Sequence, residues 1–134
     1  MRAIYGSDGR NTTAAENPDA ALVWYDNAGE RIFPPGMREP RRFDLGPWGE
    51  LPMHNHDGPD HEVLIPLVGE FEVMCADGER ATIGVGDMVV SGLGQAHAVR
   101  NLTGEPAVIF IFATPAHPDE PRYTNARVAE HATT

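Results

Sequence analysis

The sequence predicts a single all-β domain, a sandwich or barrel of short strands. Gly and Pro, which interrupt helices and form tight turns, number 14 and 12 among 134 residues. From Leu51 onward, strand-like stretches recur at regular intervals and are separated by turns that contain Gly. No stretch in that region keeps the apolar period of about 3.6 residues that marks an amphipathic helix. The length suffices for one hydrophobic core.

Two strands are expected before the regular region, and seven within it. The early ones are Ala21–Tyr25 and Arg41–Leu45, separated by a turn at Phe33–Gly36. The later ones have Gly or Asp-Gly at their ends and comprise Leu51–His56, Glu62–Val68, Phe71–Cys75, Arg80–Ile83, Asp87–Ser91, His97–Asn101 and Ala107–Ala113.

The chain divides by composition into three parts. Residues 1–20 are small and polar and are expected to form a flexible N-terminal arm. Residues 21–114 contain the strands of the barrel, and residues 115–134 form a polar C-terminal tail with one short helix near Asn125–His131. No repeat or low-complexity tract interrupts this order.

Charge and hydropathy exclude several classes of partner. Twenty acidic residues against ten basic ones give a formal charge of −10, which argues against nucleic acid and against anionic membrane surfaces. The apolar runs Val63–Val68 and Val108–Phe112 are too short to span a bilayer. No apolar segment near the start resembles a signal peptide. Cys75 is the sole cysteine, so no internal disulfide forms, and a cytoplasmic location is expected.

Three of the six histidines lie within eight residues, from His54 to His61. His54 and His56 are two positions apart, so in a strand they share a face and lie about 6.6 Å apart along it. Two imidazoles placed in this way can converge on one metal ion. The alternative interpretation is a solvated pair on an edge strand.

Two motifs give this cluster a context. One series resembles the second motif of the cupin superfamily, G-x5-P-x-G-x2-H-x3-N. It comprises Gly86, Gly92, Gly94, His97 and Asn101, with Gly92 in the place of the proline. The first cupin motif, G-x5-H-x-H-x3–4-E-x6-G, resembles the series Gly49, His54, His56, Glu62 and Gly69. In the first motif, four residues instead of five precede the first His, and five instead of three or four precede the Glu.

This resemblance implies a fold, a cofactor and partners. The fold is a single cupin β-barrel, also called a double-stranded β-helix or jelly roll, in which His97 faces His54 and His56 from another strand. The site would hold one divalent metal ion per chain (Zn, Fe, Mn, Ni or Cu), because imidazole suits all of these ions. The partner would be a small-molecule substrate. Cupins pair through N-terminal strands, which implies a homodimer, with Trp24 and Tyr25 as candidate interface residues.

The fourth ligand is either His61 or Glu62, because adjacent strand residues point to opposite faces. The spacing of the first cupin motif, counted forward from His56, selects His61. The same spacing counted back from Gly69 selects Glu62. A hairpin near Gly69 would place Glu62 on the more apolar face, which consists of Glu62, Leu64, Pro66, Val68, Phe71, Val73 and Cys75. Glu62 is therefore favoured, although a bulge at Asp60–His61 would reverse the choice. A shell of four histidines would be similar to that of the aromatic polyketide cyclase cupins, which hold zinc at the floor of a hydrophobic cavity.

A metal with open coordination positions indicates an enzyme. The favoured function is redox-neutral, of the cyclase, isomerase or lyase type, with the ion as Lewis acid on a small enolisable or oxygen-rich metabolite. Glu62 and His61 are the candidate catalytic residues, His61 as a proton carrier if it is not a ligand. The alternatives are a dioxygenase with a redox-active ion and a non-catalytic cupin that binds a small ligand.

Other residues are candidates for the surroundings of the site. Met53, Phe110 and Phe112 are candidate lining residues of an apolar pocket. Arg38, Arg41 and Arg42 are interpreted as solvated charges at a strand edge in preference to anion contacts at the mouth. Cys75 is expected to be a buried, inert thiol beside the pocket.

Overall fold

The computed structural model describes residues 3–11, 20–25, 39–56, 58, 60–123 and 125. The expected turn at Phe33–Gly36 and, beyond Asn125, the expected helix lie outside these residues. The elements in chain order are η1 (Gly6–Asp8), β1 (Arg10–Asn11), β2 (Ala20–Trp24), β3 (Arg41–Leu45), β4 (Glu50–His54), β5 (Asp60–Val68), β6 (Glu70–Cys75), β7 (Arg80–Gly84), β8 (Val89–Val90), β9 (His97–Asn101) and β10 (Ala107–Pro115). Within the described ranges, no helix has the length and hydropathy needed to cross a membrane.

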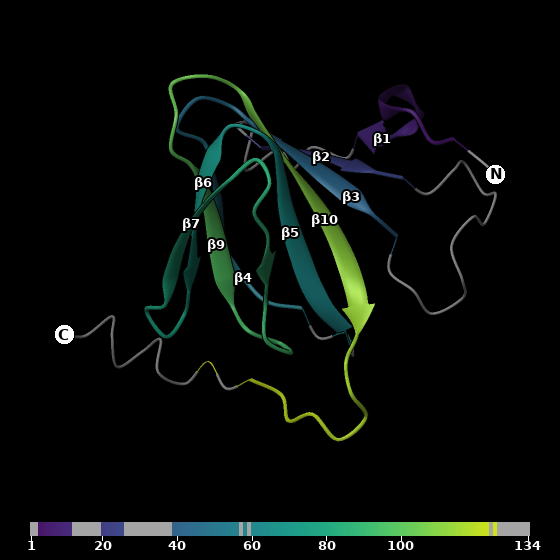
Figure 1. Ribbon diagram of the computed structural model, residues 1–134, viewed down its shortest axis with the longest axis vertical. Helices are drawn as coiled ribbons and strands as arrows, with labels where there is room; N and C mark the ends of the chain where they lie inside the picture. The colour runs from purple at the N-terminus through teal and green to yellow at the C-terminus, as the bar shows by residue number, and fades with distance from the viewer. Residues whose placement is uncertain are drawn as a thin grey trace.

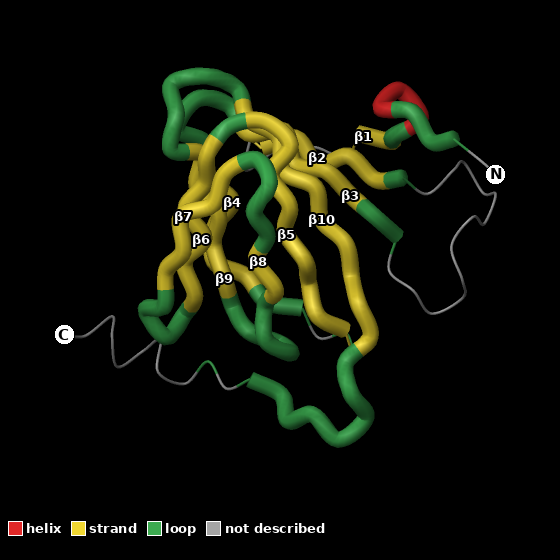
Figure 2. Tube along the Cα trace, in the orientation of Figure 1, coloured by secondary structure: helices red, strands yellow, loops and turns green. Residues whose placement is uncertain are grey.

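Within the described residues, the strands form two antiparallel sheets that face each other (Figure 1). In this part of the chain one sheet has six strands in the order β1-β2-β3-β10-β5-β8, and the other has four in the order β4-β9-β6-β7. Apart from the short η1, the described chain consists of strands and loops (Figure 2). The predicted all-β fold is confirmed.

Alternation of side chains explains how the core forms. Along β3, Arg41, Phe43 and Leu45 are buried and the residues between them are only partly buried. Phe43 pairs with Ile109 and Arg41 pairs with Ile111, so the inner face of β3 continues onto β10. Apolar inner faces of the two sheets then pack together and exclude water. The buried core comprises Ala20, Phe43, Leu45, Leu64, Phe71, Val73, Ile83, Val99, Ala107, Ile109 and Ile111.

The connection at Gly69 differs from the expected hairpin. β5 pairs with β10 and β8, whereas β6 pairs with β7 and β9, so Gly69 carries the chain from one sheet to the other. Its φ of 92° suits glycine, and a Cβ there would lie 2.7 Å from that of Ala107. The predicted inner face holds at Glu62 and Phe71, because the inner faces of both sheets meet the same core. It is wrong at Val68, which is 51% exposed and lies beyond a register shift between β5 and β10. Glu62 and Phe71 are both buried.

β4 ends earlier than expected, at His54 instead of His56. Its pairing with β9 is irregular between Leu51 and His54. Pro52 lies in this stretch and has no N–H to donate to a neighbouring strand. His56 therefore lies in the loop after β4, and the expectation of two ligands from one strand is wrong. β8 is likewise shorter than the expected strand Asp87–Ser91.

The chain after β10 crosses beneath the end of the barrel where β5 and β9 begin (Figure 1). We call residues 116–123 and Asn125 the C-terminal strap. Arg122 donates hydrogen bonds to the carbonyl oxygens of His56 at 3.0 Å and Gly58 at 3.1 Å. The Tyr123 amide donates to the carbonyl oxygen of Leu93 at 2.6 Å. The strap thus joins two loops that are far apart in the sequence.

Candidate metal centre

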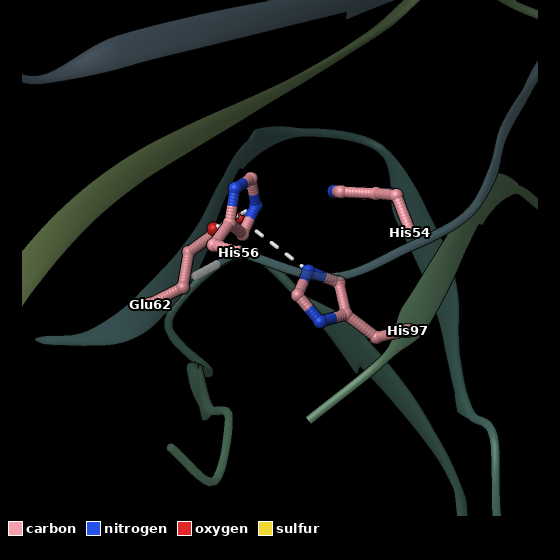
Figure 3. A group of neighbouring side chains, drawn as sticks. All are labelled: His54, His56, Glu62 and His97. Atoms are coloured by element: carbon pink, nitrogen blue, oxygen red, sulfur yellow. Dashed lines mark ion pairs between the residues drawn. The ribbon is translucent and has the colours of Figure 1, made fainter. Parts of the chain in front are cut away.

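Three strands and the loop after β4 bring His54, His56, Glu62 and His97 together at one end of the barrel. His54 is the last residue of β4, and His97, the first of β9, is its partner across the sheet. Glu62 belongs to β5 in the opposite sheet. Figure 3 shows the three imidazoles and the carboxylate directed toward a common space.

The ligand atoms of these four side chains all lie within 4.8 Å of one another. Two nitrogens that bind one ion at about 2.1 Å are at most about 4.2 Å apart. The widest separation therefore exceeds the span of a shared ion by at most about 0.6 Å. The cluster has the size of a metal-ligand set.

Backbone contacts fix the orientation of two of the imidazoles. Nδ1 of His54 lies 2.8 Å from the Pro52 carbonyl oxygen, and Nδ1 of His97 lies 2.9 Å from that of Gln95. Because a carbonyl oxygen only accepts, each Nδ1 carries the proton, and in the neutral ring Nε2 keeps its lone pair. Metal-binding histidines commonly have such an outer hydrogen bond.

Two of the converging nitrogens are buried without a hydrogen-bond partner among the described residues, Nε2 of His56 and Nε2 of His97. They lie 2.5 Å and 3.4 Å from the Glu62 carboxylate oxygens, without the angles of a hydrogen bond. A buried polar atom without a partner is unfavourable. A cation at the common point would satisfy both nitrogens and the carboxylate, so these residues fit a metal ion.

Arg41 lies behind the carboxylate and is buried, with 3% of its side chain exposed. Its Nη2 donates to Glu62 Oε2 at 2.9 Å. Burial alone would raise the pKa of Glu62, but contacts with His56 and His97 and the charge of Arg41 outweigh it and hold this pKa far below its usual value. The carboxylate is therefore ionised at neutral pH, as a metal ligand must be.

The histidines respond differently to the same surroundings. Burial lowers the pKa of His54. Burial is the largest effect on His97 and acts to lower its pKa, but the contact with Glu62, the charge of that carboxylate and the contact with Gln95 together outweigh it and raise the pKa overall. Without a metal, His97 is consequently the easier of the two to protonate.

A cavity of about 270 Å³ opens beside the cluster. Two of the histidines form part of its wall, and the remainder is apolar except for one guanidinium. The lining residues are Leu22, Trp24, Arg41, Phe43, Leu51, His54 and His56. A small organic molecule in this cavity would contact both the imidazoles and the aromatic wall.

Comparison with known proteins identifies the family. The family described as Cupin domain matches residues 41–113, more than half of the chain. The chain belongs to the cupin family. No curated protein sequence matches it significantly.

Solved structures with the same fold include cupins of varied description. A predicted oxalate decarboxylase from Thermotoga maritima superposes with a TM-score of 0.69 at 15% identity, covering 86% of this chain and 100% of that one. The polyketide cyclase RemF from Streptomyces resistomycificus gives 0.64 at 15% identity, covering 100% and 94%. Drosophila melanogaster CENP-C, bound to CAL1, gives 0.64 at 15% identity, covering 82% and 83%. At these identities the likeness concerns the fold.

The structure explains how this cupin departs from the second motif. A Cβ at Gly92 would lie 3.0 Å from the Tyr123 ring, and one at Gly94 would lie 2.6 Å from the Arg122 guanidinium. The strap therefore occupies the space beside the position where the family pattern has proline. Asn101, the last residue of the motif, is fully buried and donates to the carbonyl oxygens of Gly46 and Glu105. Together with the bond that its side-chain oxygen accepts from the Thr103 amide, these contacts steady the turn after β9.

His61 lies outside the cluster. Its neighbour Glu62 pairs with Ala113 on the inner face of the barrel, so His61 faces outward. Nδ1 of His61 lies 2.7 Å from the carbonyl oxygen of Ser91, and Nε2 contacts the Glu120 carboxylate of the strap. Of the two candidates for fourth ligand, the structure places only Glu62 with the three histidines.

The expected pocket residues lie elsewhere. Ile109 and Ile111 face the core, so Phe110 and Phe112 project from the outer face of the sheet. There they line, with Tyr25, a separate hollow of about 380 Å³. Met53 is exposed and does not line the cavity beside the histidines.

The sequence interpretation missed Arg41 and Trp24 as cavity residues. Both line the cavity, and the interpretation of Arg41 as a solvated charge is wrong, because 3% of its side chain is exposed. The interface role of Trp24 stays a prediction. Tyr25, the other predicted interface residue, is buried within the single chain and stacks on Phe110. The alternation in Arg41, Phe43 and Leu45 was the available signal, because it places all three on one face. The homodimer stays a prediction.

Proposed function

We propose that this cupin is a metal-dependent enzyme that holds one divalent ion with His54, His56, Glu62 and His97. The observation that carries the proposal is the set of inward-facing Nε2 atoms beside an ionised carboxylate. Two of these nitrogens are buried without a hydrogen-bond partner among the described residues. When bound, the ion supplies a Lewis acid that stabilises negative charge on substrate oxygens.

The chain's own residues would bind the ion, orient its ligands and enclose the substrate. Pro52 and Gln95 carbonyl oxygens hold the proton of His54 and His97 on Nδ1 and so keep each Nε2 available. Arg41 fixes the Glu62 carboxylate and offsets its charge. Leu22, Phe43 and the rest of the apolar wall limit water around a bound molecule, which strengthens electrostatic interactions there. Because His61 faces away, we assign it no proton transfer.

A redox-neutral reaction on an enolisable or oxygen-rich small molecule, of the cyclase, isomerase or lyase type, is the favoured chemistry. The apolar cavity next to the imidazoles supports it, as does the structural likeness to a polyketide cyclase. A ligand set of histidines and one carboxylate also suits iron, so a dioxygenase is the alternative outcome of the test.

The test uses deuterium exchange. Protein loaded with zinc or manganese is incubated in D₂O without oxygen with pyruvate, acetylacetone and phenylpyruvate, and exchange at the carbon next to the carbonyl is followed by NMR. The proposal predicts exchange that a chelator abolishes and that Glu62→Gln greatly slows. Oxygen consumption by the iron form, without anaerobic exchange, would assign the site to oxidative chemistry instead.

A further inference from the structure

The buried Arg41 has a place in the cavity that metal binding alone does not explain. A buried ion pair such as Arg41–Glu62 commonly stabilises a fold no better than apolar residues of the same size. The guanidinium also lies over the Trp24 ring, with Cζ 5.1 Å from the ring centroid. Both side chains line the cavity beside His54 and His56. A guanidinium held in this way is suited to contact a bound molecule.

The charges around the cavity favour an anion. Among the described residues, no acidic side chain lines it, and the nearest carboxylate, that of Glu62, is balanced by Arg41. A divalent ion at the cluster would therefore leave its full double charge in a poorly solvated space. An anion would be attracted there strongly, and a cation would be repelled.

The volume and lining favour a flat molecule of limited size. Trp24 and Phe43 present aromatic surface, and Leu22 and Leu51 complete an apolar wall. The volume of about 270 Å³ lies just below the range of about 300–1,000 Å³ that is usual for small-molecule sites. One ring with its substituents fits such a space.

We propose, on the basis of the proposed function, that the cavity binds a planar organic anion of about one ring, which carries adjacent oxygens and places its charge at Arg41. Aromatic and enolic hydroxy acids have this chemistry. The adjacent oxygens would face the histidine cluster, and the flat ring would lie against Trp24. Arg41 is thus a specificity-determining residue.

Isothermal titration calorimetry of the zinc-loaded protein with three probes tests the proposal. Salicylate is the planar anion, salicylamide its neutral counterpart, and 2-hydroxycyclohexanecarboxylate its non-planar counterpart. We expect the Kd of salicylate to be at least about tenfold lower than that of either counterpart. A hydrogen bond to a charged group in a site shielded from water changes affinity by about this factor. Equal affinities for salicylate and salicylamide would overturn the inference.

Matched variants locate the effect. Arg41→Gln should remove the preference for salicylate over salicylamide, whereas Arg42→Gln should retain it, because Arg42 bonds to Asp44 and Tyr25 away from the cavity. Arg41→Lys keeps the charge and should keep part of the preference. An equal loss in the Arg41→Gln and Arg42→Gln variants would contradict the assignment. If Arg41→Gln does not fold, the affinities of the three probes for the unchanged protein and for Arg41→Lys test the assignment instead.

Elemental analysis of the same samples separates the two proposals. Zinc that does not bind at all would defeat the proposed function. Zinc bound stoichiometrically, without preference for the planar anion, would overturn this inference alone.

Discussion

Glu62 and His61 are neighbours in the chain with opposite surroundings. Glu62 is buried among three imidazoles, and His61 lies between Ser91 and the strap. We predict that Glu62→Gln weakens zinc binding by about 100-fold or more, since the loss of outer contacts alone costs about 10- to 100-fold. His61→Gln should leave zinc affinity within about threefold of the unchanged protein. Competition with a fluorescent chelator measures both. A larger loss for His61→Gln than for Glu62→Gln would reverse the ligand assignment.

Asn101 is a second residue whose role can be measured. Its side-chain amide donates to Gly46 and Glu105 carbonyl oxygens, and its carbonyl oxygen accepts from the Thr103 amide and hydroxyl. Asn101→Ala would remove the partner of these partly buried groups, at a cost of about 1–3 kcal/mol in the free energy of unfolding. Urea denaturation measures this loss. A change below about 0.5 kcal/mol would show that the network is unimportant for stability.

At the scale of elements, the strap is the feature that holds the ligand-bearing loops. Arg122 donates a hydrogen bond to the backbone carbonyl oxygen of His56, the residue whose imidazole is a proposed ligand. Tyr123 packs on the turn at Gly92. Asn125 accepts from the Ala96 amide at 2.8 Å, next to His97. The strap therefore contacts the chain on both sides of the cluster.

We predict that Arg122→Gln and Gly92→Pro each weaken zinc binding by about tenfold. This is the lower end of the loss that follows when a residue supporting a metal ligand is replaced. Gly92→Pro restores the family residue but crowds Tyr123 and removes the amide that donates to Gln95 Oε1 at 2.8 Å. Arg100→Gln is the matched control, because Arg100 is exposed and its nearest carboxylate contact is 4.0 Å long. Chelator competition reports affinity, and limited proteolysis reports release of the strap. Unchanged affinity and protection in both strap variants would contradict this role.

Elements differed in how well the sequence predicted them. β3 and β9 match their predicted bounds, because alternating burial defines β3 and the adjacent turns define β9. The end of β4 was missed, because the irregular register between Leu51 and His54 does not appear in residue spacing, although Pro52 was an available signal against a regular strand. The strap was missed for another reason. Its bonds from Arg122 reach backbone carbonyl oxygens, which every residue has, so no pattern of side chains marks them.

At the scale of the whole molecule, metal binding and folding are linked. An ion that binds the folded chain raises its thermal midpoint, and protons compete with the ion for the imidazoles. In the metal-free protein the pKa of His97 is raised, so its pairing with Glu62 adds stability at low pH that is lost as the pH rises through that pKa. The metal-bound protein needs neutral imidazoles, so the stability that the ion adds increases as the pH rises.

We therefore predict that the rise in Tm on addition of zinc grows as the pH increases from about 5.5 to about 8, across the ordinary histidine pKa of about 6.5. Differential scanning fluorimetry with and without zinc at each pH measures it. His54→Ala, which removes one imidazole of the cluster, is the control and should flatten the dependence. A rise in Tm that is independent of pH would show that the histidines are not the site of binding.

The measurement that tests the account most directly is the metal content of the freshly purified protein, followed by zinc titration of the chelator-treated protein. We predict one divalent ion per chain in the unchanged protein and almost none in His97→Ala, with both proteins folded. Folded protein that contains no ion and takes up none, or a His97→Ala variant that retains it, would contradict the assignment of His54, His56, Glu62 and His97 as a metal centre.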